Sequence, residues 1–541
     1  MAVTNRDALR AEKILSIPDT ALVPALAASE PEARFLNEMG QVSRHSAVFF
    51  AGTIFTTAVG YLFKLYVAHM LGAAALGVYA LGMTIVGFFG LFSGLGFPQS
   101  AVRFVAAYSA KRRDDRLHGF LRGAIKLLIV ANITLAGIML LIGPWLARQL
   151  YHTPELIPFL WLFAIIFVTA AFSGFLGQVL AGYKDIARRT VVSSFIASPL
   201  NVVLGVGLLA IGMGLRGYLL AQVVSGLIVL VLLAAITWKL TPAAARRMPV
   251  QPVPLQPEVF WFSAAVFGVS ALEFLLAQAD KVVMGILLDV QQVGIYTIAA
   301  SLVAFVPIAL QSVNQIFSPT IADLHARGEH ALLGRIFQTL TKWIIGFTLP
   351  LAFVMIVYSR VLMRMFGPAF EAGWLVLIVG TIAQLINTGT GSVGYLLLMS
   401  GNQRRLIRVQ MIMACFMVVA ILILVKPFGI VGVATASALT NAVSNFLYLR
   451  EVRAALHISP YTRKYFRLLG PCAASVAVVL SIRFFGFRFQ PQWFGIGVAL
   501  VSSYATFCAL SLAVGLDDDD RVIVAAIQKR LPGIRRRDRS L

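Results

Sequence analysis

The stretch KLYVAHMLGAAALGVYAL at residues 64–81 returns in altered form as KVVMGILLDVQQVGIYTI at residues 281–298. Lys64 aligns with Lys281, and the Gly-Val-Tyr of the first block aligns with the Gly-Ile-Tyr of the second. A further match, at almost the same offset, joins the block that begins at Gly214 to the block that begins at Gly429. Because the offset hardly changes between the matches, the whole unit is repeated. Repeated units of this kind are typical of membrane transporters, whose halves share a central site.

The composition predicts a protein of the lipid bilayer. Of the 541 residues, 59% are hydrophobic and 13% are charged, and the mean hydropathy is +0.85. Apolar stretches long enough to cross about 30 Å of hydrocarbon as helices recur along the chain. They lie at 47–70, 77–98, 123–146, 157–182, 190–212 and 216–238, then at 260–288, 293–316, 337–358, 374–400, 407–426 and 430–450, and finally at 466–486 and 493–515. The sequence therefore predicts an all-α polytopic membrane protein of about fourteen transmembrane helices.

The expected organisation is two pseudo-symmetric six-helix lobes followed by two C-terminal helices. We expect a cytoplasmic N-terminal segment at 1–46, the first lobe at 47–240, a cytoplasmic linker at 241–259, the second lobe at 260–452, the two added helices at 453–515, and a cytoplasmic tail at 516–541.

The net charge of +22 is distributed according to loop position. Most lysines and arginines fall in the termini and in connections on one side of the expected spans. The exceptions are Arg148, Arg216, Arg360, Arg364, Lys426, Arg483 and Arg488. Basic residues concentrate on the cytoplasmic side of membrane proteins, so both termini are expected in the cytoplasm. A nucleic-acid binder would gather the charge on one folded patch, so we exclude that class.

The sequence predicts no metal or cofactor site. Cys415, Cys472 and Cys508 all lie in apolar spans, without the spacing of a disulfide framework or a zinc site. The phosphate-binding motif of nucleotide-driven pumps does not occur in the sequence. Any driving force would come from an ion gradient, from the gradient of the cargo, or from a separate partner.

Four ionisable residues inside the expected spans are candidates for function, because an unpaired charge near the membrane centre costs about 2.5 to 3.5 kcal/mol to insert. Glu273 and Asp280 are seven residues apart, which places both carboxylates on nearly the same helix face. Lys64 and Lys281 occupy the same position in the two halves. Two interpretations of the lysines stay open: they hold an anionic group across a central cleft, or they extend their ammonium groups to the membrane interface.

Three further residues are weaker candidates for contact with a cargo. Arg103 ends the second expected span, where the distribution of basic residues already explains it. Gln311 and Asn314 are polar residues of the eighth span, and hydrogen bonds between helices would also explain them.

The stretch from Lys64 to Arg103, together with the glycine blocks at Gly214 and Gly429 and with Asp280, resembles bacterial polysaccharide-biosynthesis flippases of the O-antigen type. These belong to the superfamily of multidrug, oligosaccharidyl-lipid and polysaccharide exporters. The resemblance covers roughly residues 45–515. It rests mostly on glycine and aliphatic positions.

The resemblance implies a multi-pass protein of the bacterial inner membrane. Its V-shaped pair of lobes would move a polyprenyl-pyrophosphate-linked oligosaccharide from the cytoplasmic to the periplasmic leaflet by alternating access. The resemblance also implies that Lys64 and Lys281 meet the pyrophosphate, and that Glu273 or Asp280 couples transport to protons or sodium. The expected partners are the lipid-linked cargo, membrane lipids, and a glycan polymerase or glycosyltransferases, without any nucleic acid. Three alternatives remain: an organic-cation antiporter of the same superfamily, a flippase for a cell-wall lipid precursor, and a membrane-embedded glycan polymerase or ligase. The short outward loops argue against the enzyme.

Overall fold

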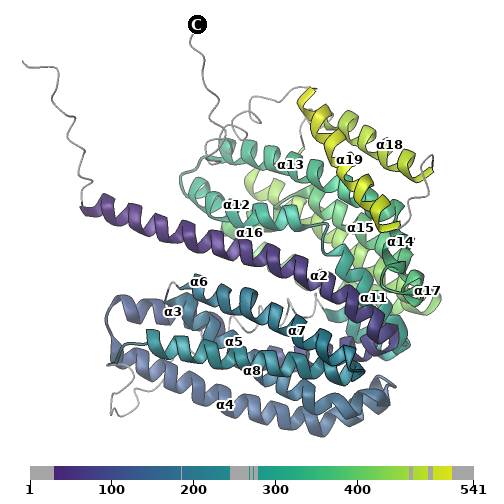
Figure 1. Cartoon of the computed structure of the whole chain (residues 1–541). Helices are drawn as coiled ribbons and strands as arrows, with labels where there is room; N and C mark the ends of the chain where they lie inside the picture. The colour runs from purple at the N-terminus through teal and green to yellow at the C-terminus, as the bar shows by residue number, and fades with distance from the viewer. Residues whose placement is uncertain are drawn as a thin grey trace, which may run out of the picture.

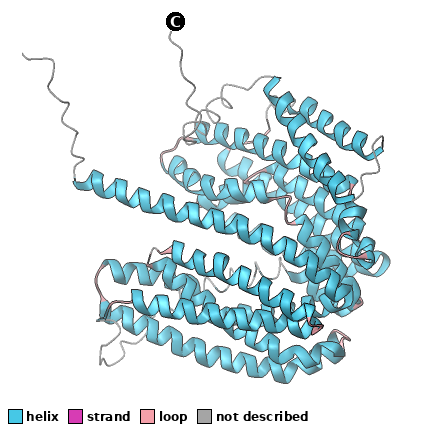
Figure 2. Ribbon diagram, viewed as in Figure 1, coloured by secondary structure: helices cyan, strands magenta, loops and turns pink. Residues whose placement is uncertain are grey.

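The structure of the chain is a computed structural model that describes residues 30–94, 96–183, 185–243, 267, 272, 274, 278–461, 467–484 and 492–513. Within these residues every regular element is a helix (Figure 2). The elements of the first half are α2 (Glu30–Ser93), α3 (Phe97–Ala110), α4 (Asp114–Trp145), η1 (Leu146–Leu150), η2 (Pro154–Phe159), α5 (Leu160–Gly182), α6 (Ile186–Thr190), η3 (Val191–Ile196), α7 (Ala197–Ala210) and α8 (Gly214–Leu240).

The second half follows the same plan. Residues 278–287 are helical, and after them come α11 (Val290–Val303), α12 (Ile308–Ala326), α13 (His330–Val357), α14 (Ser359–Arg364), η4 (Pro368–Gly373), α15 (Trp374–Thr390), α16 (Val393–Met399) and α17 (Gln403–Leu456). The added helices are α18 (Leu469–Phe484) and α19 (Gln492–Ala513).

Nine helices of the described chain are long and apolar enough to cross a membrane, or ten if a bent pair counts as one span. Two of them contain two expected spans each: α2 has a non-helical residue at Gly72 and α17 has one at Gly429. The bent pair, α11 with α12, is the eighth expected span, and the shorter helix Gly470–Phe484 is the thirteenth. The chain is therefore a multi-pass membrane protein. The total of about fourteen spans stays a prediction, because much of the seventh lies outside the described residues.

The backbone repeats as the sequence does. Gly214 and Gly429, which the alignment pairs, have φ angles of 53° and 54°. Residues with side chains rarely adopt such angles, so glycine is required where the chain turns into the last span of each half. The repeated sequence blocks therefore correspond to repeated structure.

Among the described residues, the buried core that the two halves share lies at one end, and two ring contacts, Phe88 with Phe274 and Phe92 with Phe267, join the halves further along α2. One large cluster of buried residues takes Leu81 and Phe163 from the first half and Val293 and Ile421 from the second. Elsewhere each half has its own core: Phe97, Phe120 and Phe175 pack together in the first, and Phe317, Phe337 and Val452 pack together in the second. We call the end with the common cluster the joined end and the opposite end the split end. Figure 1 shows α3 to α8 as one bundle and α12 to α17 as the other, with α2 running between them.

The helices α2 and α11, which contact each other at the joined end, are both interrupted nearer the split end. The chain after α2 is interrupted around Gly96, whose φ is 77°, before α3 begins. The interruption between α11 and α12 spans residues 304–307 and bends the pair by 55°. Both α3 and α12 belong to the split end, because their buried residues lie in the separate cores.

The pair α18 and α19 packs against α13 (Figure 1). Val479 and Ala499 form a small core with Val354 and Tyr358. The Tyr504 hydroxyl donates a hydrogen bond to the Phe347 carbonyl oxygen at 2.7 Å. The two added helices are thus attached to the second half.

Candidate functional site

A reciprocal contact closes the joined end. A methyl group added at Gly77 would overlap the carbonyl oxygen of Val290, and one added at Gly294 would overlap the carbonyl oxygen of Ala73. In the repeat, residue 73 corresponds to 290 and residue 77 to 294. In each half, the equivalent glycine of the repeat therefore lies against the equivalent backbone position of the other half. Only glycine permits so close an approach.

Lys64 and Lys281 lie at matching depths below this contact. Lys64 lies eight residues before the non-helical Gly72, and Lys281 lies eight residues before Asp289, which follows the end of its helix at residue 287; eight residues correspond to about 12 Å along a helix. Both side chains are half-buried, and the two ammonium groups are near enough to interact electrostatically. The structure thus brings the two lysines together, one from each half.

The partners of the lysines leave positive charge available. The Lys281 ammonium donates a hydrogen bond to the Gln278 side-chain oxygen at 2.9 Å. Lys64 has no hydrogen-bond or ion-pair partner within the described part of the chain. Two like charges held close in a membrane interior repel one another, so the pair is stabilised when an anion lies between them.

Asp280 points to a tyrosine and not to the neighbouring ammonium group. The Tyr296 hydroxyl donates a hydrogen bond to Asp280 Oδ2 at 2.8 Å, and the Lys281 backbone N–H donates to Oδ1 at 2.8 Å. Tyr296 is only 4% exposed. The carboxyl group is therefore bonded within the second half. Although Asp280 precedes Lys281 in sequence, it does not bond to the Lys281 ammonium group. Glu273, the other acidic candidate, lies outside the described residues.

The first half carries no acid at the corresponding place. The repeat partner of Asp280 is Phe63, whose ring packs against Tyr218 at 5.9 Å between centroids. The partner of Tyr296 is Tyr79, whose hydroxyl accepts a hydrogen bond from the Gln222 amide nitrogen at 3.1 Å. The two halves thus repeat a tyrosine but change its partner from an amide to a carboxylate.

An aromatic contact next to Lys64 joins the halves, and nothing in the sequence pointed to it. The Tyr61 ring meets Phe305 edge-on at 5.1 Å and Phe366 edge-on at 5.9 Å. Tyr61 lies about one helical turn before Lys64. Its two partners come from the break after α11 and from the loop after α14, so no local pattern could have revealed the contact.

The weaker candidates lie at the split end, beyond the helix breaks. Arg103 is exposed on α3, with its guanidinium 5.4 Å from the centre of the Phe104 ring. Gln311 is exposed on α12, whereas Asn314 is buried and its Oδ1 has no partner among the described residues. Among the described residues no group of three potential ligands could hold a metal ion.

The fold is that of known transporters. The solved structure of the lipid II flippase MurJ in an inward closed conformation matches with a TM-score of 0.67 at 11% identity, over 89% of this chain and 100% of that chain. An inward-facing multidrug resistance MATE family transporter of the MOP superfamily matches with a TM-score of 0.63 at 14% identity, over 74% and 94%. The Vibrio cholerae MATE transporter VcmN in the bent form matches with a TM-score of 0.51 at 16% identity, over 77% and 98%. At these identities the likeness establishes the architecture alone.

The family follows from the sequence match. No curated protein sequence matches the chain. The family model described as polysaccharide biosynthesis protein matches residues 66–372, which is more than half of the chain; the match includes Lys281 and begins two residues after Lys64. This multi-pass membrane protein, with its two repeated halves, belongs to the polysaccharide biosynthesis protein family.

Proposed function

We propose that this protein is a flippase that moves a polyprenyl-pyrophosphate-linked oligosaccharide from the cytoplasmic to the periplasmic leaflet of a bacterial inner membrane. The moved molecule would serve the assembly of an O-antigen or an exopolysaccharide. The family and the transporter fold support this reading, and one of the proteins with that fold is named as a lipid II flippase.

The observation that carries the proposal is the position of Lys64 and Lys281, which lie at matching depths below the glycine contact that joins the halves. A pyrophosphate group cannot cross hydrocarbon unless its charge is met, and two ammonium groups about 12 Å below a closed end are suited to meet it. An organic-cation antiporter, the alternative within the superfamily, would place its cargo against the same two positive charges, which disfavours that reading.

The arrangement of the cores supports alternating access. The halves share one core at the joined end and have separate cores at the split end. The distribution of basic residues assigns the split end to the cytoplasm, so this conformation would receive cargo from the inner leaflet. Opening requires the contact between Gly77 and Val290 and its counterpart to part while the split end closes.

The acidic residues are the proposed coupling site. Asp280 is held by Tyr296 in the second half, and the sequence spacing predicts Glu273 two helical turns before it. A carboxyl group that gains and loses a proton or a sodium ion would change the balance of charge beside the lysine pair. Transport would then depend on the ion gradient.

The experiment measures which leaflet holds the lipid-linked oligosaccharide. Cells that lack the protein are supplied with wild type, with Lys64→Glu plus Lys281→Glu, or with Lys239→Glu, and an externally added glycan-binding probe reports exposed precursor. Lys239 is the matched control, because it is an exposed lysine at the end of α8. We expect wild type and the control to restore exposure, and the double variant to leave intact precursor on the cytoplasmic side.

Two outcomes would contradict the proposal. Normal exposure in the double variant would remove the lysines from the transport path. Normal exposure in cells without the protein, with unpolymerised units outside, would indicate a polymerase or ligase. Membrane content of each variant is measured in parallel, so that loss of folded protein is recognised.

A further inference from the structure

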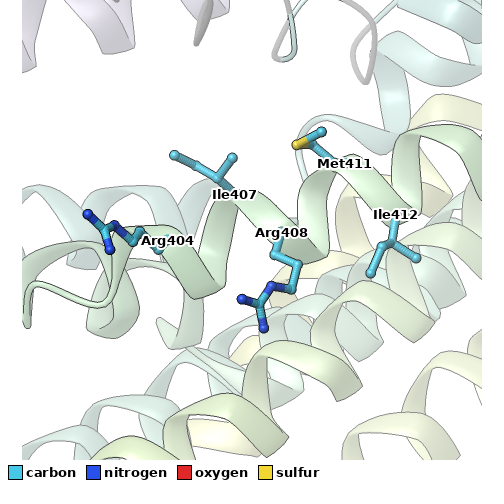
Figure 3. A pocket seen from close by; sticks show the side chains of 5 residues that line it. All are labelled: Arg404, Ile407, Arg408, Met411 and Ile412. Carbon is cyan, nitrogen blue, oxygen red and sulfur yellow. The ribbon is translucent and has the colours of Figure 1, made fainter.

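The split end of the second half carries a mixed basic and apolar surface at the start of α17. Its residues are Arg404, Ile407, Arg408, Met411 and Ile412, and they line a hollow of about 400 Å³ (Figure 3). All five side chains are exposed. We call these five residues the α17 surface.

The two arginines of the α17 surface are not neutralised by the protein. Neither Arg404 nor Arg408 has a hydrogen bond or an ion pair with any described residue. The arginine between them in sequence differs, because Arg405 pairs with Glu451 at 2.9 Å. Arg404 and Arg408 are one helical turn apart, so their guanidinium groups can reach one ligand.

The corresponding loop of the first half shows that the repeat does not require this arrangement. There Arg188 pairs with Asp185 at 3.3 Å, and Arg189 donates to the Gln178 side-chain oxygen at 3.4 Å. The arginines Arg188 and Arg189 before α7 are therefore bonded within the protein. Those at the start of α17 remain available for a partner.

The apolar members of the α17 surface begin a face that continues into the membrane. Ile407, Met411 and Ile412 are 38%, 57% and 54% exposed, and Val419 and Ile423 further along α17 are 55% and 65% exposed. The order along the helix is thus two cationic groups followed by hydrocarbon. A membrane phospholipid has the same order, a charged headgroup followed by an acyl chain.

We propose that the α17 surface is a binding site for an anionic phospholipid, with the headgroup phosphate held by Arg404 and Arg408 and an acyl chain lying along Ile407, Met411 and Ile412. The guanidinium group presents paired N–H donors that match two phosphate oxygens, which makes arginine a stronger phosphate ligand than a point charge. The occupant is a lipid of the surrounding membrane and not the cargo. The site is therefore independent of the proposed transport path.

Photo-crosslinking in nanodiscs tests the site. Purified full-length protein is placed in phosphatidylcholine discs with a small fraction of photoactivatable phosphatidylglycerol, and labelled peptides are identified by mass spectrometry. We expect labelling within residues 404–412. Each basic residue near the lipid surface raises the affinity for an anionic lipid about fivefold. We therefore expect Arg404→Gln plus Arg408→Gln to lower the affinity for phosphatidylglycerol about 25-fold.

The controls distinguish a specific lipid site from general attraction of anionic lipid to basic residues. Lys111→Gln plus Arg113→Gln removes two exposed charges from the same end of the first half and is expected to leave the labelling unchanged. Arg404→Lys plus Arg408→Lys keeps the charge but loses the paired donors, so an intermediate affinity is expected. Three results would each overturn the proposal. They are an equal loss of labelling in Lys111→Gln plus Arg113→Gln, unchanged labelling in Arg404→Gln plus Arg408→Gln, and equal labelling of the wild type by a phosphatidylcholine probe.

Discussion

At the scale of single residues, the two tyrosines of the repeat differ in the charge of their partner. Tyr296 donates to a carboxyl group, whereas Tyr79 is paired with an amide. Hydrogen bonds to an ionised group are about twice as strong as neutral ones, and a buried carboxylate that loses a donor is left poorly solvated. The same substitution at the two sites should therefore have unequal effects.

We expect Tyr296→Phe to lower the free energy of unfolding by about 1.5 to 3 kcal/mol, and Tyr79→Phe by about 0.5 to 1.5 kcal/mol. The measurement is denaturant unfolding of the purified variants in the same detergent. Asp280→Asn combined with Tyr296→Phe serves as the control, because the neutral amide removes the buried charge. Equal losses for the two tyrosines would mean that the Asp280 carboxyl group is protonated in the folded protein.

At the scale of elements, α2 and α11 determine whether the joined end is closed. Their contact depends on two glycines, Gly77 and Gly294, each of which lies against the backbone of the other helix. Atoms forced into a packed contact typically cost about 1 to 3 kcal/mol. Because the contact must part when the protein opens at this end, the cost falls on one conformation only.

We expect Gly77→Ala to shift the conformational equilibrium away from the joined state about 5- to 150-fold, with the fold retained. Distances between spin labels on the two halves at this end would report the shift. Gly90→Ala is the matched control, since Gly90 is also in α2 and an added methyl group meets no atom within 4 Å. A distance distribution in Gly77→Ala identical to that of wild type would show that the contact does not hold this end closed.

At the scale of the whole molecule, the repeat and most spans could be predicted because hydrophobic length and matched residues are visible in the sequence. The pairing of Lys64 with Lys281 followed from the same alignment. The contact of Tyr61 with Phe305 and Phe366 could not be predicted, since it joins distant segments that no shared motif marks. The closed joined end was equally hidden, because glycines in membrane helices serve many contacts.

The conformation and the expected orientation together predict one-sided access to the lysine site. In a variant with the three native cysteines replaced, Lys64→Cys should react with a membrane-impermeant thiol reagent from the cytoplasmic side. The comparison uses inside-out and right-side-out vesicles. We expect at least about tenfold faster labelling in inside-out vesicles, because the joined end blocks the opposite approach. Faster labelling in right-side-out vesicles would reverse the orientation of the termini.

The helix breaks give the two halves arms of unequal length. Beyond its break, the first half continues with α3 over 14 residues, or about 21 Å, and the second half continues with α12 over 19 residues, or about 28 Å. An equal rotation at the two breaks would move the tip of the longer arm about a third further. The split end would then open asymmetrically, because the wall of the second half would withdraw further. A bulky cargo would enter along that side and not along the axis that relates the halves.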